Sequence, residues 1–236
     1  MKQSQILHFL FVLTILIQLS PQQVFGQENN DLEGWTAVEL DVRATKKLSF
    51  SISEHLRLRN DISTTKNYFT QLKVNYELFK NFELGGGVRY ITKNDDVGGN
   101  QGLRSLFRYQ FDASYQHKVN AITVYTRFRY QNKNRLGLSE SEGDVHKEQI
   151  RFRLGVGYTI KPIKVKVRLS SELFNETESL NSEGGINRYR HVLRFSKRVK
   201  KIGLFALFYG LQDDTEGNSK ISRQILGFKY SYRFKI

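Results

Sequence analysis

The stretch ILGFKYSYRFKI at residues 225–236 decides the fold, because it alternates strictly between two kinds of side chain. Large apolar or aromatic residues occupy one phase, which comprises Leu226, Phe228, Tyr230, Tyr232 and Phe234. Small or cationic residues occupy the other phase, which comprises Gly227, Lys229, Ser231, Arg233 and Lys235. Successive side chains of a strand point to opposite faces of a sheet. The stretch therefore predicts a strand with one apolar face and one cationic face.

The same alternation recurs along the chain and predicts a barrel. We predict ten strands, at residues 48–59, 68–79, 82–92, 106–116, 122–130, 150–158, 165–174, 188–196, 202–209 and 225–236. The connections between them alternate in length. Short connections lie at residues 80–81, 117–121, 159–164 and 197–201, and longer polar ones lie at 60–67, 93–103, 131–149, 175–187 and 211–222. Outer-membrane barrels combine short periplasmic turns with long external loops. The expected fold is all-β, a transmembrane antiparallel up-and-down barrel of about ten strands, with twelve as the alternative.

The N-terminal residues predict export. Residues 1–26 contain Lys2, an apolar core at 6–19 and a cleavage site near Gly26, so we expect a cleaved signal peptide. We divide the remainder into a lead-in segment, residues 27–47, and a barrel domain, residues 48–236. Residues 35–43 also alternate, but counting them as a strand would give an odd number and start the chain outside the cell. We therefore expect an outer-membrane protein of a Gram-negative bacterium, with the lipid bilayer and the barrel-assembly machinery as partners.

Composition excludes several other classes. The chain has no cysteine, which excludes a disulfide framework, a cysteine-ligated metal site and a lipoprotein anchor. Its net charge of +14 invites a nucleic-acid interpretation. However, the arginines alternate with aromatic and branched residues along strand after strand instead of forming one basic face. We therefore expect no nucleic-acid partner, and nothing in the sequence calls for a cofactor or a metal.

The predicted inward face is rich in arginine. The residues that we expect to line the lumen are Arg57, Arg59, Arg89, Arg108, Arg127, Arg129, Arg151, Arg153, Arg168, Arg188, Arg190, Arg194, Glu77, Asp112 and Glu172. These side chains have two possible uses. They can form an arginine–carboxylate network that fills a narrow lumen, since small barrels are usually filled by side chains. They can also line a narrow passage for small anions, because rings of arginine select anions. The expected role is accordingly structural or accessory, or that of a narrow, anion-preferring, porin-like channel.

Two polar residues fall on the predicted lipid-facing phase, where a charge is costly. We expect a bulge or a register shift to turn Glu54 and His191 away from the lipid. Ser171 and His191 also lie on adjacent predicted strands, an arrangement similar to that of outer-membrane phospholipases. No motif surrounds either residue, and no third group is evident to orient the histidine. We therefore expect no enzymatic activity and keep a lipid hydrolase only as a minor alternative.

The main alternative to a membrane barrel is a soluble periplasmic or secreted β-sheet protein that binds an apolar or acidic ligand. That protein would need its aromatic phase inside and its arginines in water.

Several short motifs occur in an order that resembles a known family. They are Trp35 after the signal, LRLR at 56–59, GVRY at 87–90, RFRY at 127–130, ELFN at 172–175 and NRYR at 187–190. In this order they resemble the domain-of-unknown-function family number 2490 of Bacteroidota and other Gram-negative bacteria. The resemblance covers nearly the whole mature chain. It implies an outer-membrane β-barrel and supplies no activity or catalytic residues.

Overall fold

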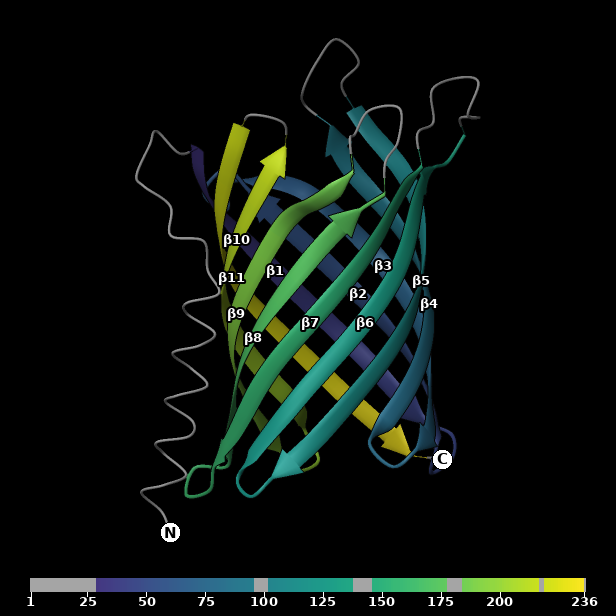
Figure 1. Cartoon of the computed structure of the whole chain (residues 1–236), viewed down its shortest axis with the longest axis vertical. Coiled ribbons are helices and arrows are strands. Elements are labelled where there is room, and N and C mark those ends of the chain that lie inside the picture. Colours follow the sequence, from purple (N-terminus) through teal and green to yellow (C-terminus); the bar gives the residue numbers. More distant parts are fainter. Residues whose placement is uncertain (1–28, 96–101, 138–145, 178–183, 217–218, 236) are drawn as a thin grey trace.

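The computed structural model describes residues 29–95, 102–137, 146–177, 184–216 and 219–235, and this part of the chain forms one closed barrel (Figure 1). Its eleven strands are β1 (Asn29–Arg43), β2 (Leu48–Arg59), β3 (Thr64–Phe79), β4 (Phe82–Asp95), β5 (Gly102–Val119), β6 (Ile122–Arg135), β7 (Lys147–Ile160), β8 (Val165–Glu176), β9 (Gly185–Val199), β10 (Gly203–Glu216) and β11 (Ser219–Lys235). Strands adjacent in sequence pair antiparallel, as predicted. The predicted signal peptide lies outside the described residues. No helix in the described ranges is long and apolar enough to cross a membrane.

The barrel closes through a parallel seam between its first and last strands. β1 pairs antiparallel with β2 and parallel with β11, so that Val38 lies opposite Tyr230. The prediction that residues 35–43 form a lead-in outside the wall was therefore wrong. It assumed that all pairs are antiparallel, which requires an even number of strands. A parallel first–last pair removes that requirement, because both strands then run in the same direction.

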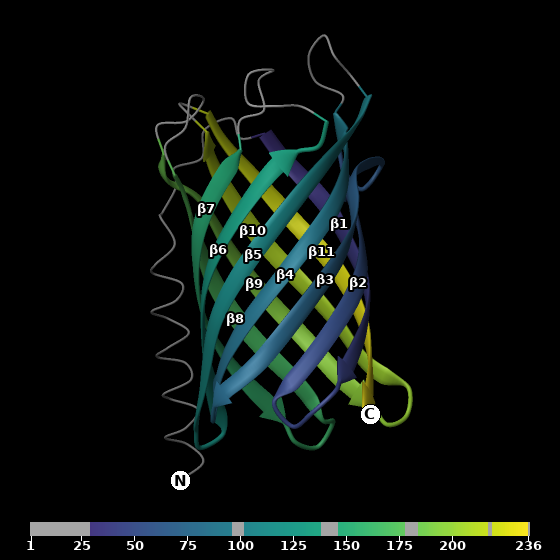
Figure 2. The ribbon, with the colours of Figure 1, turned by 90° about the vertical axis from the view of Figure 1, so that its right-hand side faces the viewer.

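The strands are longer than predicted at the end of the barrel that carries the longer connections. β3 begins at Thr64, β10 continues to Glu216 and β11 begins at Ser219, so half of the expected loop at 60–67 and most of the expected loop at 211–222 belong to strands. These extensions are mostly polar, with isolated apolar residues such as Leu211 and Ile221, and carry no sustained alternation for a sequence pattern to detect. At the other end, short connections lie at all four predicted places, but three of them differ from the predicted bounds and are found at 120–121, 161–164 and 200–202; this end also contains the C-terminus (Figure 2). Asn81 and Asn120 adopt positive φ there (71° and 55°), a conformation that asparagine tolerates better than most residues.

The two phases of the strands face opposite sides of the wall, as predicted. Phe111 is 61% exposed on the outer surface, whereas its neighbours Gln110 and Asp112 are buried inside the barrel. β10, whose facing the sequence left undecided, follows the same rule: Leu207 and Tyr209 face outward, and Ala206 and Phe208 face inward. Gly227 on β11 lies opposite Phe208 on β10. Because Gly227 has no side chain, it leaves the space that the Phe208 ring fills. The barrel thus has an apolar outer wall and a mainly polar interior.

Glu54 and His191 do not turn inward, so the expected bulges at these residues were wrong. Register shifts in β2 and β8 lie at Arg57/Leu58 and Phe174/Asn175 instead. Glu54 is exposed on the outer wall, where its carboxylate accepts a hydrogen bond of 3.0 Å from the Thr70 hydroxyl. His191 hydrogen-bonds to its cross-strand partner Ser171. Both outward polar residues are thus partnered by a hydroxyl on the neighbouring strand.

Candidate functional site

The interior contains a cavity of about 680 Å³ lined by side chains from every part of the barrel wall. Eleven of the twelve arginines that were predicted to face the lumen line it: Arg57, Arg89, Arg108, Arg127, Arg129, Arg151, Arg153, Arg168, Arg188, Arg190 and Arg194. Arg59 lines a second cavity beside the β2–β3 turn and donates a hydrogen bond of 3.3 Å to the Asn94 carbonyl. Among the described residues, eighteen arginines and lysines line the main cavity against three carboxylates. The cavity surface is therefore strongly cationic.

The predicted carboxylates lie behind this surface. Glu172 on β8 is 2% exposed, and Asp112 on β5 is 7% exposed. Glu77 faces the interior opposite Glu83, close to the β3–β4 turn, and is not among the residues that line the cavity. The structure therefore places two of the three predicted carboxylates among the arginines and leaves Glu77 apart from them.

Glu172 pairs with three arginines that two neighbouring strands place around it. Cross-strand pairing sets Arg153 opposite Glu172, Arg153 opposite Arg127, and Arg129 opposite Arg151. The Glu172 carboxylate accepts from Arg127 Nη2 at 2.7 Å, Arg151 Nη2 at 2.9 Å and Arg153 Nη2 at 2.6 Å. Charged side chains are almost never fully buried unless they are paired. We call this group the Glu172 cluster. In this cluster, one buried carboxylate neutralises part of the positive charge of three guanidinium groups.

Asp112 neutralises a second part of the interior. Arg129 donates to both of its oxygens, with Nε at 2.5 Å and Nη2 at 2.8 Å. Lys73 Nζ lies 3.8 Å from the same carboxylate. Bidentate pairs of this kind are shorter and stronger than neutral hydrogen bonds. These contacts occupy part of the interior and cross-link β3, β5 and β6.

Three inward-facing aromatic rings connect arginines across the interior. Arg89 stacks on Phe69 at 3.8 Å, and Arg57 lies 5.1 Å from the same ring. Arg57 also stacks on Trp35 at 3.8 Å, and Arg190 lies 4.9 Å from Trp35. We call the resulting chain of contacts the aromatic–arginine belt, and its members are Trp35, Arg57, Phe69, Arg89, Arg151, Phe174 and Arg190.

The belt crosses the interior, because Arg190 on β9 reaches Trp35 on β1 past the two strands that lie between them. Contact of a guanidinium with the face of an aromatic ring is attractive, and more so when water is excluded. Trp35, Phe69 and Phe174 were not predicted to face the interior. The available signal was their position on the inward phase, since Phe69 follows the outward Tyr68 and Phe174 follows the outward Leu173.

Several belt arginines are held by neutral amides instead of carboxylates. Arg89 donates twice to Gln71 Oε1, with its Nε at 3.1 Å, and Arg190 Nε donates to Gln212 Oε1 at 2.8 Å. Arg108 lies directly opposite Arg89 across β4 and β5 and donates to Gln110 Oε1 at 2.6 Å. Gln71, Gln110 and Gln212 are all buried. The amides orient these guanidinium groups but leave their positive charge in place.

Ser171 and His191 lie on the outer wall, outside this interior. Ser171 Oγ is 2.7 Å from His191 Nδ1, so the predicted proximity of the two residues is confirmed. Asp213, which was not predicted as a partner of His191, also lies on the outward phase of β10, two residues beyond the residue that pairs with His191. Its carboxylate accepts a hydrogen bond from Ser222 at 2.5 Å. Ser171 pairs on both sides, with Leu154 and His191, so the neighbouring backbone amides belong to the ladders. In the described part of the chain, the backbone amides beside Ser171 are therefore not free to stabilise an oxyanion.

The family model described as protein of unknown function (DUF2490) matches residues 32–220, which is most of the chain. The chain therefore belongs to this family. No curated protein matches the chain.

Proposed function

We propose that this member of the DUF2490 family is an outer-membrane β-barrel whose interior admits small anions and repels cations. The observation that carries the proposal is the reversal of the usual arrangement of a globular protein. Large apolar side chains cover the outside of a closed barrel, and arginines line the inside.

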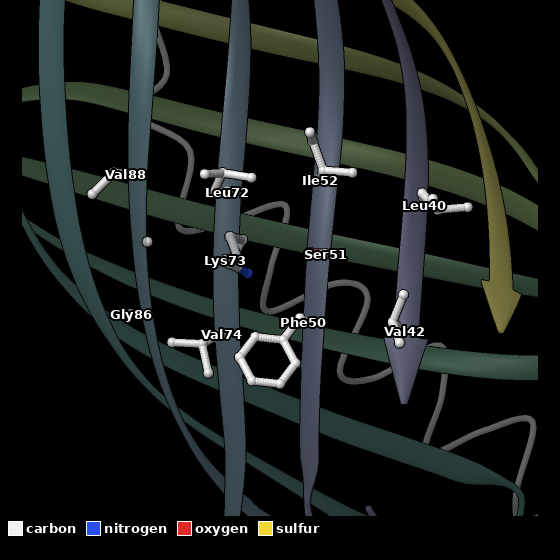
Figure 3. A pocket seen from close by; sticks show the side chains of 11 residues that line it. Leu40, Val42, Phe50, Ser51, Ile52, Leu72, Lys73, Val74, Gly86 and Val88 are labelled. Carbon is white, nitrogen blue, oxygen red and sulfur yellow. The ribbon is translucent and has the colours of Figure 1, made fainter. Parts of the chain in front are cut away.

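The outer wall supports the membrane location. Large side chains on every side of the barrel are exposed, among them Val38 at 57%, Phe111 at 61% and Leu207 at 59%. Figure 3 shows one part of this wall, where Leu40, Val42, Phe50, Ile52, Leu72, Val74 and Val88 surround a depression of about 480 Å³ above Gly86. Soluble monomers rarely expose contiguous apolar patches of more than a few hundred Å². A closed barrel also pairs its strand edges, as hydrocarbon requires. The soluble alternative needs the aromatic phase inside, which is the opposite arrangement.

The charge of the interior supports a preference for anions. The Glu172 cluster and Asp112 neutralise only part of the cationic surface, so a positive potential remains along the cavity. A narrow, low-dielectric space strengthens this potential and repels cations. The same buried clusters limit the width of the interior. We therefore expect a small conductance instead of the wide water-filled pore of large porins.

Site-directed labelling tests the orientation of the wall. The chain has no native cysteine, so single cysteines can carry a nitroxide at Phe111→Cys and Phe152→Cys, with Lys118→Cys as a control at the exposed end of β5. In vesicles, we expect oxygen, which concentrates in lipid, to accelerate the spin relaxation of the labels at 111 and 152. A water-soluble nickel complex should accelerate the spin relaxation of the label at 118. Acceleration of all three labels by the nickel complex would overturn the membrane assignment.

Planar-bilayer recording of the refolded protein under a KCl gradient tests the interior. We expect a small conductance whose reversal potential has the sign of chloride selectivity. Electrical silence at several voltages, or selectivity for potassium, would overturn the anion preference while leaving the membrane assignment to the labelling experiment.

A further inference from the structure

Three arginines at the cavity surface carry charges that the described part of the chain does not neutralise by a salt bridge. Arg89 and Arg108 are 9% and 7% exposed and lie directly opposite each other on β4 and β5. Arg57 and Arg89 both contact the Phe69 ring, at 5.1 Å and 3.8 Å from its centroid. All three line the cavity. Like charges directly opposite each other in a sheet destabilise it, so this arrangement calls for a compensating negative charge.

The contacts of these arginines leave N–H groups unused. Arg108 donates from Nη2 to Gln110, and its buried Nε has no partner among the described residues. Arg57 rests its face on Trp35 and makes no hydrogen bond that the described residues supply. Arg89 is fixed by Gln71 and by the face of Phe69. Stacking occupies the face of a guanidinium group and leaves its edge available for hydrogen bonds.

The neighbouring arginines of the same interior differ from these three, because they are paired with carboxylates. Arg127, Arg151 and Arg153 share the Glu172 carboxylate, and Arg129 binds Asp112. Gln110 lies between Arg108 and Asp112, since its amide nitrogen is 3.3 Å from Asp112 Oδ2 while its oxygen accepts from Arg108. The protein thus pairs one set of arginines with carboxylates, whereas Arg89 and Arg108 are held by amides and Arg57 rests on Trp35.

We propose that Arg57, Arg89 and Arg108 form a binding site for a compact oxyanion of the phosphate type. The planar fork of a guanidinium group matches two oxygens of such an anion, and three forks on separate strands can surround it. A halide has a single centre and cannot engage a fork in the same way. The site therefore prefers phosphate to chloride. This inference deepens the proposed function, because it names the anion that the interior retains.

Isothermal titration calorimetry of the full chain refolded in detergent micelles at low ionic strength tests the site. We expect saturable binding of inorganic phosphate, competition by sulfate and weak competition by chloride. A parallel titration with glycerol phosphate distinguishes free phosphate from a phosphate ester as the preferred form. Absence of saturable binding of both phosphate and glycerol phosphate to the wild-type chain would overturn the proposal.

Two substitutions localise the binding. Arg108→Gln and Arg57→Gln should each weaken phosphate binding at least tenfold, since each removes one fork. Both variants remove a positive charge from a repulsive group and are expected to fold. The control is Arg233→Gln on β11, because Arg233 is paired with Asp41 at 2.8 Å and does not line the cavity. Equal affinities in the control and in both site variants would overturn the assignment of the site.

The calorimetry tests the phosphate site, the bilayer recording tests the proposed function, and either result can be negative without the other. Anion-selective conductance without saturable phosphate binding would remove the site and leave the proposed function intact. Saturable binding to an electrically silent protein would keep the site and remove the proposed anion passage, since calorimetry in micelles requires no passage through the barrel.

Discussion

Replacement of the buried carboxylate Glu172 by glutamine should strongly destabilise the barrel. Glu172 accepts four N–H groups from three arginines: Arg127 Nη2 at 2.7 Å, Arg151 Nε at 3.1 Å, Arg151 Nη2 at 2.9 Å and Arg153 Nη2 at 2.6 Å. In Glu172→Gln the amide oxygen retains two of these donors, but the acceptor of those two bonds is no longer charged. The amide nitrogen then faces the other two donors, so two charge-assisted bonds are lost.

The magnitude follows from the burial of the cluster. Each hydrogen bond to a charged group contributes about 1.5–3 kcal/mol, so the two lost bonds predict a loss of about 3–6 kcal/mol. Removal of one partner of a buried ion pair gives a similar figure of about 3–5 kcal/mol. With an m-value of roughly 4 kcal/mol per molar for guanidinium chloride, this corresponds to a midpoint lower by about 1 M.

Fluorescence of Trp35, the single tryptophan of the chain, provides the assay. The indole packs against Arg57 inside the folded barrel, so its environment changes when the barrel unfolds. Unfolding of the refolded protein by guanidinium chloride would be followed for wild type, Glu172→Gln and the matched control Glu77→Gln. Glu77 forms no salt bridge among the described residues and lies opposite Glu83, so its substitution should change stability by less than about 0.5 kcal/mol. A midpoint for Glu172→Gln that matches the midpoint for Glu77→Gln would refute the claim that this cluster stabilises the interior.

Two further predictions test the packing and the closure of the barrel. Gly227→Ala should lower the free energy of unfolding by about 1–3 kcal/mol, because the added Cβ would overlap the Phe208 ring. Gly86→Ala, whose Cβ would lie 3.7 Å from Val74, should lower it by less than about 1 kcal/mol in the same assay. Equal costs for the two substitutions would contradict the assigned position of Phe208. For the seam, cysteines at Leu40 and Tyr232, which are partners across β1 and β11, should form a disulfide on oxidation. Cysteines at Leu40 and Phe228, about 13 Å apart along the strand, should not, and cross-linking of both pairs alike on a non-reducing gel would contradict the parallel register.

The sequence predicted the wall of the barrel well, because the direction of a side chain in a strand is a local property. Phe111 and Arg129 face opposite sides as a result of their position in their own strands, whatever those strands pair with. Eleven of the twelve arginines predicted to face inward line the main cavity for the same reason. The failures concerned residues 35–43, which were taken for a lead-in, the mostly polar ends of strands, and the outward residues Glu54 and His191, for which a cost in lipid was taken as evidence of a bulge.

The partners of each inward residue could not be predicted from alternation. Contact between Arg190 and Trp35 depends on the curvature of the closed wall, which brings β9 and β1 within reach across the interior. The division of the arginines between carboxylates and amides depends on register, which sets Arg153 opposite Glu172 and Arg108 opposite Arg89. Register is a relation between strands, and the pattern within one strand does not contain it.

Alternation with a period of two residues thus determined that the chain forms strands, which residues face outward and which face inward. Only the tertiary structure decided that residues 29–43 complete the wall through a parallel pair, and that three inward rings join arginines from distant strands. The physical reason is that facing follows from the backbone geometry of each residue, whereas closure and contact follow from how eleven strands share one set of hydrogen bonds around a curved surface.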